Sequence, residues 1–346
     1  MARKHLLGAA ATLASGGAAM GWRACERTDE RAVAADPEQA ALGRPLGGTP
    51  VAVESGDGTV LHAELFGPPD RPTIVLIHGW VCSLELWHYQ IAELSASYRL
   101  VAYDLRGHAR SQPASGLDYS MDALAADLDA VLRVCVPDGQ RAVVAGHSMG
   151  AMSVVAWAGA HPDEVAERLA GVMLLNVGVE RLIAEARIVI TVGALSRLKQ
   201  LVGSRMLNLP LPAPRRLSPV VSRVVRYVAL TKDASPAQVA FCVRMFLGCR
   251  PDVRAAFGAT LAGLDLLSAL DALVVPTVVV AGELDRLTPP VHARAIAGAL
   301  PDVHLVELAA TGHTSPLEAH SEVTGLLRML ADRVLVAPRD SLAADG

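Results

Sequence analysis

The 346-residue chain has few aromatic residues, few cysteines and no large excess of charge of either sign. Hydrophobic residues make up 52% of the chain but aromatic ones only 4%, so the core must be built mainly from Ala, Val and Leu. The net charge of −4 argues against a general nucleic-acid binder, because such proteins present a strongly basic surface. The length is enough for one large domain with a full core, or for two small ones.

The five cysteines are scattered along the chain, and no two of them form a Cys-x-x-Cys pair. This pattern predicts neither a disulfide framework nor a metal site. Two interpretations stay open at this point. Cys242 and Cys249 could pair in an exported protein, or the cysteines could be free thiols buried as small apolar residues.

The N-terminus differs in composition from the rest of the chain. Arg3 and Lys4 precede an uncharged stretch from Leu6 to Trp22 that is rich in Ala, Leu and Gly, as in a signal peptide. The stretch is short for a membrane-spanning helix, which needs about 20 apolar residues, so a retained anchor is one alternative and a disordered Ala-rich tail is another. We expect residues 1–48 to hold a signal peptide or membrane anchor followed by a linker. The protein would then be exported or membrane-associated, with a cytoplasmic location as the alternative.

Short apolar runs alternate with helical stretches through most of the chain, which is typical of a parallel sheet with helices on both faces. A β-hairpin with an Asp-Gly turn precedes this alternation. The expected strands are residues 51–54, 59–65, 73–77, 99–103, 141–145, 171–175, 276–281 and 303–308.

The alternation stops in the middle of the chain, where residues 177–264 show helical periodicity without a convincing strand. We therefore predict an α/β fold whose mostly parallel central sheet is flanked by helices. Residues 49–176 and 265–336 would form the core and 177–264 an inserted helical cap. Residues 337–346 would be a disordered tail.

The most informative motif is Gly-His-Ser-Met-Gly at residues 146–150, between a buried strand and a helical stretch. A serine at such a junction lies on a very tight turn, and the glycines on either side avoid clashes. The turn exposes the Ser148 hydroxyl above the sheet and places the Met149 N–H at a helix N-terminus, where negative charge is favoured. The pentapeptide alone occurs by chance in a chain of this length with odds of roughly one in ten. Other residues of the chain must therefore show whether Ser148 belongs to a catalytic site.

Those partners follow two later strands. Chemistry in open parallel sheets gathers at the carboxyl ends of the strands, where Asp285 and His313 join Ser148. A serine hydroxyl needs a neutral imidazole to take its proton, and the imidazole needs an acid to fix its tautomer. The chain order Ser, Asp, His is the order that accompanies a Gly-x-Ser-x-Gly elbow.

With these residues the chain resembles the α/β-hydrolase superfamily from about Val51 to Val334. It looks most like the serine esterases and lipases close to the cofactor-free haloperoxidase-like group. The matching segments are specific for the superfamily but not for a substrate. They are residues 78–80 (His-Gly-Trp), 104–108 (Asp-Leu-Arg-Gly-His), 146–150, 282–285 (Gly-Glu-Leu-Asp), 288–289 (Thr-Pro) and 312–313 (Gly-His).

The resemblance implies a role for each matching position. Ser148 would be the nucleophile, His313 the general base and Asp285 the orienting acid. The backbone N–H groups of Trp80 and Met149 would form the oxyanion hole, where one donor is worth on the order of 2.7–4 kcal/mol. The resemblance implies neither a metal nor an organic cofactor.

Several neighbouring residues offer alternatives. Glu283 lies two residues from Asp285 and could compete as the acid, although Asp285 matches the family position. In some relatives the acid follows the sixth strand, but here that position holds Asn176, which cannot take the role. We expect structural, loop-ordering roles for three histidines close to the site, namely His78, His108 and His147.

The predicted cap is strongly basic. Residues 177–264 contain thirteen Arg and Lys but only four Asp and Glu, which gives the segment a charge of +9 and leaves −13 for the rest of the chain. Basic, amphipathic helices suit an anionic lipid surface. The alternative is a solvated basic face over ordinary packing.

We therefore predict a serine hydrolase that cleaves carboxylic esters through an acyl-enzyme on Ser148, acting on apolar or lipid-like acyl substrates. The serine at the elbow argues against dehalogenases and epoxide hydrolases of this fold, which use an aspartate there. One alternative is a haloperoxidase-like or perhydrolase-like activity on the same triad. The other is a non-catalytic binding protein on this scaffold. The expected partners are a small-molecule ester and a membrane surface, with no nucleic acid.

Overall fold

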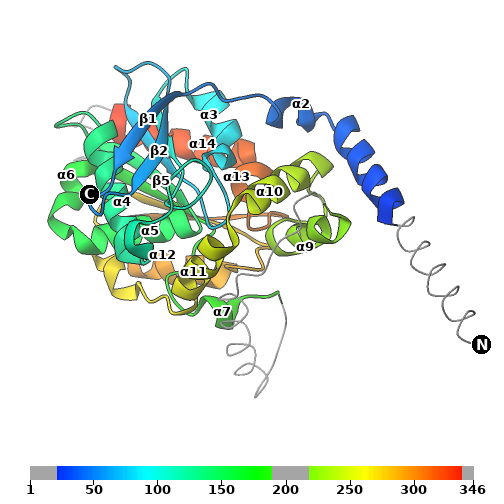
Figure 1. Ribbon diagram of the computed structural model, residues 1–346. Coiled ribbons are helices and arrows are strands. Elements are labelled where there is room, and N and C mark those ends of the chain that lie inside the picture. The colour runs from blue at the N-terminus through cyan, green and yellow to red at the C-terminus, as the bar shows by residue number, and fades with distance from the viewer. Residues whose placement is uncertain (1–21, 189–217, 337–346) are drawn as a thin grey trace, which may run out of the picture.

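The computed structural model describes residues 22–188 and 218–336, and it is built around an eight-stranded sheet with the order β1-β2-β4-β3-β5-β6-β7-β8 (Figure 1). β2 pairs antiparallel with β1 and β4, and the other pairs are parallel. This confirms the predicted α/β class with a mostly parallel sheet. The strands are β1 (Thr49–Glu54), β2 (Val60–Phe66), β3 (Thr73–Ile77), β4 (Arg99–Tyr103), β5 (Ala142–His147), β6 (Leu169–Leu175), β7 (Thr277–Gly282) and β8 (Val303–Leu308).

Helices cover both faces of the sheet, so the central strands are buried along their length. In β3, Val75 and Ile77 pack into the hydrophobic core on one face, while Ile74 and Leu76 pack into the core on the other face. The helices on the first face are α4 (Met121–Cys135), α5 (Met149–Ala160) and α12 (Pro290–Ala299). Those on the second face are α3 (His88–Leu94) and α14 (His320–Ala331).

In its described part, the chain between β6 and β7 forms helices joined by loops and adds no strand to the sheet. A short antiparallel bridge between Glu180 and Asp265 joins the two ends of this insertion. Part of the predicted cap, residues 189–217, lies outside the described residues. The described helices are α7 (Leu182–Glu185), α9 (Pro219–Ala229), α10 (Pro236–Gly248) and α11 (Pro251–Ala262).

Local sequence explains where the longer cap helices begin. The Ser218 hydroxyl accepts a hydrogen bond from the Val221 N–H at the start of α9. Ser235 and Gln238 form a capping box at the start of α10. Proline at the first helical position of both helices fits a site where no backbone donor is needed.

The segment expected to be a linker is largely helical in its described part. Residues 22–35 form a helix, and α2 (Glu38–Leu42) follows it. Figure 1 shows the first helix, in dark blue, projecting from the body beyond α10. The carboxylates of Asp36 and Glu38 bind the N-terminal turn of α10, so this segment is fixed to the cap.

Two further expectations can be compared with the structure only in part. Most of the predicted signal peptide and the whole predicted C-terminal tail lie outside the described residues. In the part of the chain that the structure describes, no helix combines the length and the apolar composition needed to cross a bilayer. All five cysteines are free thiols, which excludes the Cys242–Cys249 disulfide in this structure.

Candidate active site

Ser148 lies on the predicted tight turn between β5 and α5. Its backbone has φ 52° and ψ −117°, a conformation that a residue with a side chain adopts only under strain. A Cβ atom on Gly146 would come within 2.5 Å of the Ala151 nitrogen, and one on Gly150 within 2.5 Å of the His78 carbonyl oxygen. The two glycines of the motif are thus required by close backbone approach, and the turn holds Ser148 half exposed.

The structure brings Asp285 and His313 together at the same edge of the sheet. Asp285 follows β7 and His313 follows β8, and the His313 Nδ1 atom lies 2.8 Å from the Asp285 Oδ2 atom. Both side chains are buried. The bond at Nδ1 leaves Nε2 as the ring nitrogen available for a reacting group. Glu283, the alternative acid, has an exposed side chain, so Asp285 is the carboxylate that orients His313.

A network of donors keeps Asp285 ionised. Its Oδ1 atom accepts hydrogen bonds from the Leu287 and Thr288 N–H groups at 2.8 and 3.0 Å. Its Oδ2 atom accepts from the Asn176 side-chain amide at 3.0 Å. Burial alone would raise the pKa of Asp285, but the charge of His313 and these hydrogen bonds outweigh it and leave the pKa below its usual value.

The loop after β3 packs directly on the Ser148 turn. A Cβ atom on Gly79 would lie 2.8 Å from the His147 Nδ1 atom and 3.1 Å from the Ser148 Cβ atom, so only glycine fits this contact. Trp80 is the next residue of this loop after Gly79, which contacts Ser148. Met149 is the first residue of α5, where an N–H group has no partner within the helix. The two predicted oxyanion donors thus come from segments in contact at the nucleophile.

His78 and His108 tie this loop to the neighbouring loop that follows β4. The His78 Nε2 atom accepts from the Leu105 N–H at 3.0 Å, and the His108 Nε2 atom accepts from the Val81 N–H at 3.1 Å. Burial lowers the pKa of His78 to about 4 and that of His108 to about 3, so both rings are neutral. These contacts match the predicted loop-ordering role.

His147 joins the elbow to the segment that carries His313. The His147 Nε2 atom lies 2.8 Å from the His313 carbonyl oxygen, and the two rings are 5.0 Å apart. Burial lowers the pKa of His147 to about 3, so this ring is also neutral. Among the described residues, no hydrogen bond joins Ser148 Oγ to His313 Nε2, so the elbow meets the His313 segment through His147.

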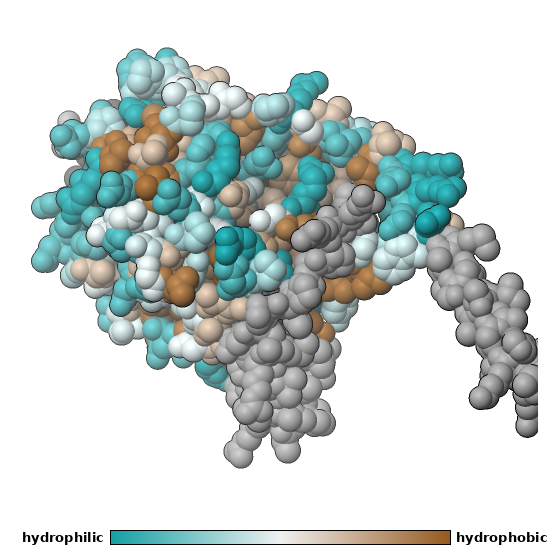
Figure 2. All heavy atoms as spheres, in the orientation of Figure 1, coloured by the Kyte–Doolittle hydropathy of each residue, from teal (hydrophilic) through white to brown (hydrophobic). Residues whose placement is uncertain are grey.

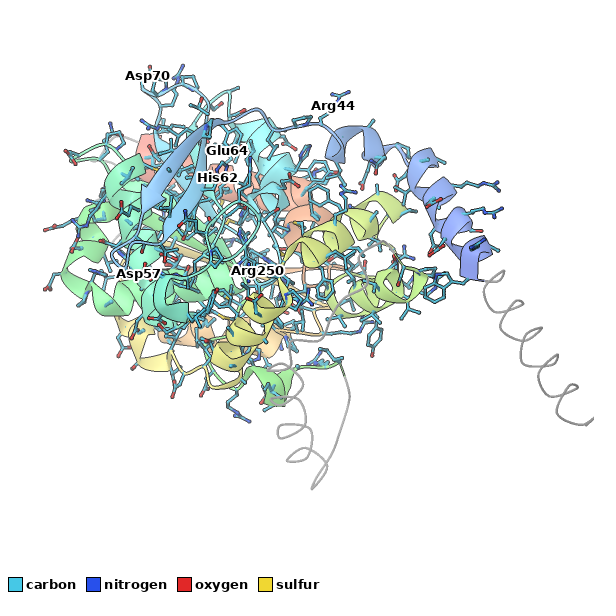
Figure 3. The ribbon with its side chains drawn as sticks, in the orientation of Figure 1. Arg44, Asp57, His62, Glu64, Asp70 and Arg250 are labelled. Atoms are coloured by element: carbon cyan, nitrogen blue, oxygen red, sulfur yellow. The ribbon has the colours of Figure 1, made fainter. Side chains whose placement is uncertain are left out.

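Ion pairs fix the loop after β4 to the neighbouring elements. The buried Arg106 guanidinium binds Asp127 at 2.6 Å and Asp57 at 2.9 Å. Arg110 binds Glu64 at 2.6 Å. Figure 3 labels Asp57 at the β1–β2 turn and Glu64 on β2. These pairs stabilise the scaffold of the site rather than its reacting atoms. Among the described residues, no group of three or more His, Cys, Asp or Glu side chains could hold a metal ion.

Two residues hold the segments of the site together through hydrogen bonds that the sequence does not indicate. Asn176 follows β6 in a left-handed conformation with φ 48° and donates to both Asp285 and the Gly312 carbonyl. The Glu318 carboxylate accepts from the Thr231 and Thr314 N–H groups at 2.7 and 3.2 Å, linking the cap to the segment after His313. The position of Asn176 directly after a predicted strand is the sequence feature that could have identified it. No sequence feature identifies Glu318, because its partner Thr231 is remote in sequence.

The family model described as "Alpha/beta hydrolase family" matches residues 74–325. The chain belongs to the α/β-hydrolase family. This match spans the sheet from β3 onward, the elbow, Asp285 and His313, and it confirms the resemblance drawn from the motifs.

Similar proteins in the family differ in chemistry. A non-heme chloroperoxidase of Streptomyces lividans is 41% identical over 118 residues, which are 33% of this chain and 41% of that protein. Epoxide hydrolase 4 of Mus musculus is 35% identical over 137 residues, which are 39% of this chain and 37% of that protein. The chain thus matches only about two fifths of the length of these curated relatives. A solved thermophilic esterase from Thermogutta terrifontis has a TM-score of 0.67 at 24% identity, covering 83% of this chain and 99% of that one, which shows the shared fold.

Proposed function

We propose that this hydrolase is a serine carboxylic-ester hydrolase. The observation that carries the proposal is the strained Ser148 turn at the same sheet edge as the 2.8 Å pair of Asp285 and His313. An aspartate at the elbow would be expected for epoxide hydrolysis, and this chain has a serine. The esterase activity of the thermophilic neighbour is consistent with the proposal but belongs to that protein.

The reaction would proceed in two steps. Ser148 Oγ attacks the ester carbonyl carbon while His313 Nε2 takes the hydroxyl proton, and the oxyanion receives hydrogen bonds from the Trp80 and Met149 N–H groups. The bond to the alcohol oxygen then breaks, and His313 returns the proton to the leaving alcohol. In the second step, water attacks the acyl-serine with His313 as base. Breakage of the bond to Ser148 Oγ releases the acid and restores the serine.

The direct test is covalent labelling of the purified protein by a fluorophosphonate probe. We expect stoichiometric labelling of the native chain, none of Ser148→Ala, and a turnover of p-nitrophenyl esters lower by roughly 10⁶-fold in that variant. Ser153→Ala is the matched control, because the hydroxyl of this buried serine of α5 donates to the Gly150 carbonyl of the same helix. Labelling that persists in Ser148→Ala, or no labelling of the native chain, would contradict the proposal. The second result would favour a non-catalytic binding protein.

A second candidate is peroxide-dependent chemistry on the same triad, favoured by the match to the Streptomyces chloroperoxidase. The test is halogenation of a dye in the presence of acetate and hydrogen peroxide. A rate above that of ester hydrolysis, again lost in Ser148→Ala, would make perhydrolysis the principal activity.

We further propose apolar or lipid-like acyl substrates and an exported or membrane-associated location. The basic, amphipathic cap and the uncharged stretch from Leu6 to Trp22 support both. A series of p-nitrophenyl esters with increasing acyl length tests the substrate class. A preference for acetate over octanoate would contradict the lipid-like assignment.

A further inference from the structure

Helix α9 presents an apolar stripe to solvent. Val220 and Val224 are each 54% exposed and Tyr227 is 49% exposed. Their spacing of four and three residues places them on one side of the helix. The other side carries Val221 and Val225, which pack against the core formed with α10. Figure 2 shows apolar surface at this edge of the molecule, between two grey segments.

Arginine side chains surround the stripe. The Arg286 guanidinium lies over the Tyr227 ring at 4.7 Å and donates to the Tyr227 carbonyl at 2.8 Å. Arg223 is an exposed residue of α9 itself, and Arg187 is exposed beside Arg286, whose carbonyl accepts its N–H. The carboxylate that the structure places against these groups is Asp29, 3.1 Å from Arg223. Cations in excess around exposed apolar residues match a surface of anionic phosphates over hydrocarbon.

The N-terminal segment leads from the same edge of the molecule. Asp29, the partner of Arg223, belongs to the helix of residues 22–35, which is therefore held beside α9. The described part of this helix includes the exposed Trp22, and in the sequence the uncharged stretch from Leu6 leads directly into it. A chain segment with the composition of a membrane-seeking sequence thus joins the molecule next to the apolar stripe.

We propose that the α9 stripe docks on an anionic lipid bilayer. Val220 and Val224 would lie among the acyl chains. Tyr227, whose hydroxyl donates to the Ile188 carbonyl, would lie with the surrounding arginines at the level of the phosphate groups. This surface is distinct from the catalytic groups, and its docking does not depend on the proposed esterase activity.

The docked helix would bring the active site to the lipid surface. The carbonyl of Ala229, the last residue of α9, accepts hydrogen bonds from the Thr314 N–H at 3.1 Å and the Thr314 hydroxyl at 2.9 Å. Thr314 directly follows His313. Beyond α9, the Thr231 N–H donates to Glu318 in the same active-site segment. The docking helix and the proposed general base therefore share one rigid set of contacts.

The test uses the full chain with an environment-sensitive fluorophore on Val224→Cys, in a Cys25→Ser background because Cys25 is an exposed thiol. The matched control carries the same fluorophore on Val134→Cys, which has a similar exposure of 56% but lies on α4, well away from α9 in Figure 1. Both proteins are mixed with vesicles of phosphatidylglycerol and phosphatidylcholine that contain spin-labelled lipid as a quencher. We expect a blue shift and quenching at position 224 but not at position 134, and weaker quenching with pure phosphatidylcholine.

The N-terminal segment alone could hold the chain on vesicles, so binding by itself is not the criterion. A fluorophore at position 224 that stays unquenched on vesicle-bound protein overturns the proposal, as does an absence of vesicle binding. A shift at position 224 without vesicles that grows with protein concentration would instead assign the stripe to a second copy of the chain.

A second variant links docking to turnover. Val220→Ser with Val224→Ser should reduce hydrolysis of a vesicle-embedded ester by roughly tenfold, because two exposed side chains lose their transfer into hydrocarbon, and should leave hydrolysis of a soluble short-chain ester unchanged. Equal loss on both substrates would contradict a docking role. Quenching at position 224 with no hydrolysis of any ester would keep the docking surface and reject the esterase function.

Discussion

Asn176 connects the acid of the site to the segment that carries His313. Its amide nitrogen donates to the Asp285 Oδ2 atom at 3.0 Å and to the Gly312 carbonyl at 3.1 Å, which uses both of its hydrogens. Its side-chain oxygen accepts from the buried Ser315 hydroxyl. Asn176, which cannot serve as the acid, thus positions Asp285 directly and His313 through the neighbouring Gly312.

Asn176→Ala should lower kcat by about tenfold with little change in KM, since a hydrogen bond to a charged group is worth about 1.5–3 kcal/mol. It should also change the acid response. The folded-state pKa of Asp285 lies below its unfolded value, so its ionised form stabilises the fold above the unfolded pKa, and this stability is lost as the pH falls through the folded pKa. Loss of one donor raises the folded pKa, so the loss begins at higher pH.

The measurements are steady-state kinetics and the melting temperature from neutral pH to about pH 3. Thr324→Ala is the control, because this buried threonine of α14 accepts from Gln90 outside the site. It should lower the melting temperature without moving the pH dependence. If Asn176→Ala also lowers the melting temperature without changing its pH dependence, Asn176 has only a structural role.

At the residue scale, the sequence predicts the site residues that directly follow a strand of the sheet. Ser148, Asp285 and His313 follow separate strands, and a parallel sheet brings its strand ends to one edge, so their proximity could be predicted. The roles of Asn176 and Glu318 could not, because a hydrogen bond between remote side chains leaves no local pattern. The roles assigned in the reaction to all five residues remain predictions: Ser148, Asp285, His313, Trp80 and Met149.

At the scale of elements, neutral histidines join the loop after β3 to the loop after β4. Each Nε2 atom of His78 and His108 accepts a backbone N–H, so the proton of each ring lies on Nδ1, which bonds a carbonyl of its own loop. Protonation of either Nε2 would convert an acceptor into a donor that faces another donor. The contact between the loops therefore requires the neutral rings.

We predict that the free energy of unfolding falls as the pH drops from about 6.5 towards 4. The folded-state pKa values of His78 and His108, about 4 and 3, lie below the unfolded value near 6.5. The unfolded chain therefore binds more protons in this window, and stability that is fully present above pH 6.5 is lost on acidification. Each ring contributes a slope of at most about 1.4 kcal/mol per pH unit.

Urea unfolding at several pH values between about 7.5 and 4.5 measures the slope. His108→Gln should be less stable than the native chain at neutral pH but should lose stability less steeply on acidification. His304→Gln, at an exposed position of β8, should keep the native slope. A native slope near zero, or an unchanged slope in His108→Gln, would show that these rings are not neutral when buried.

Element type could be predicted from the sequence more easily than element partners. The strands appeared as short apolar runs because both sheet faces are covered, and β8 begins and ends where expected. The segment of residues 23–48 was expected to be a linker because its composition is rich in charge, Ala and Gly. Asp36 and Glu38 of this segment bind the start of α10, whose residues lie about 200 positions later, and no local window contains that contact.

At the scale of the whole molecule, the N-terminal segment, the cap and the active site form one connected body. The Asp36 Oδ2 atom accepts from the Ala237 N–H at 2.9 Å, and the Glu38 Oε2 atom accepts from the Ser235 hydroxyl at 2.8 Å. Both carboxylates lie at the N-terminus of α10, where negative charge is favoured. Gln238 in the same turn donates to Glu38 and to the Leu317 carbonyl, which continues the connection to the segment after His313.

The double variant Asp36→Ala with Glu38→Ala should release the N-terminal segment from the cap. We expect a loss of about 1–2 kcal/mol in the free energy of unfolding, as for removal of a helix cap, and faster proteolysis between residues 22 and 48. Glu30→Ala is the control, because this exposed residue of the first helix forms no hydrogen bond or ion pair with the described residues of α10 and should change neither measurement. Unchanged proteolysis in the double variant would mean that the Arg223–Asp29 pair alone holds the segment. In that case a further Asp29→Ala change should release it, because no other ion pair joins the described helix of residues 22–35 to α9.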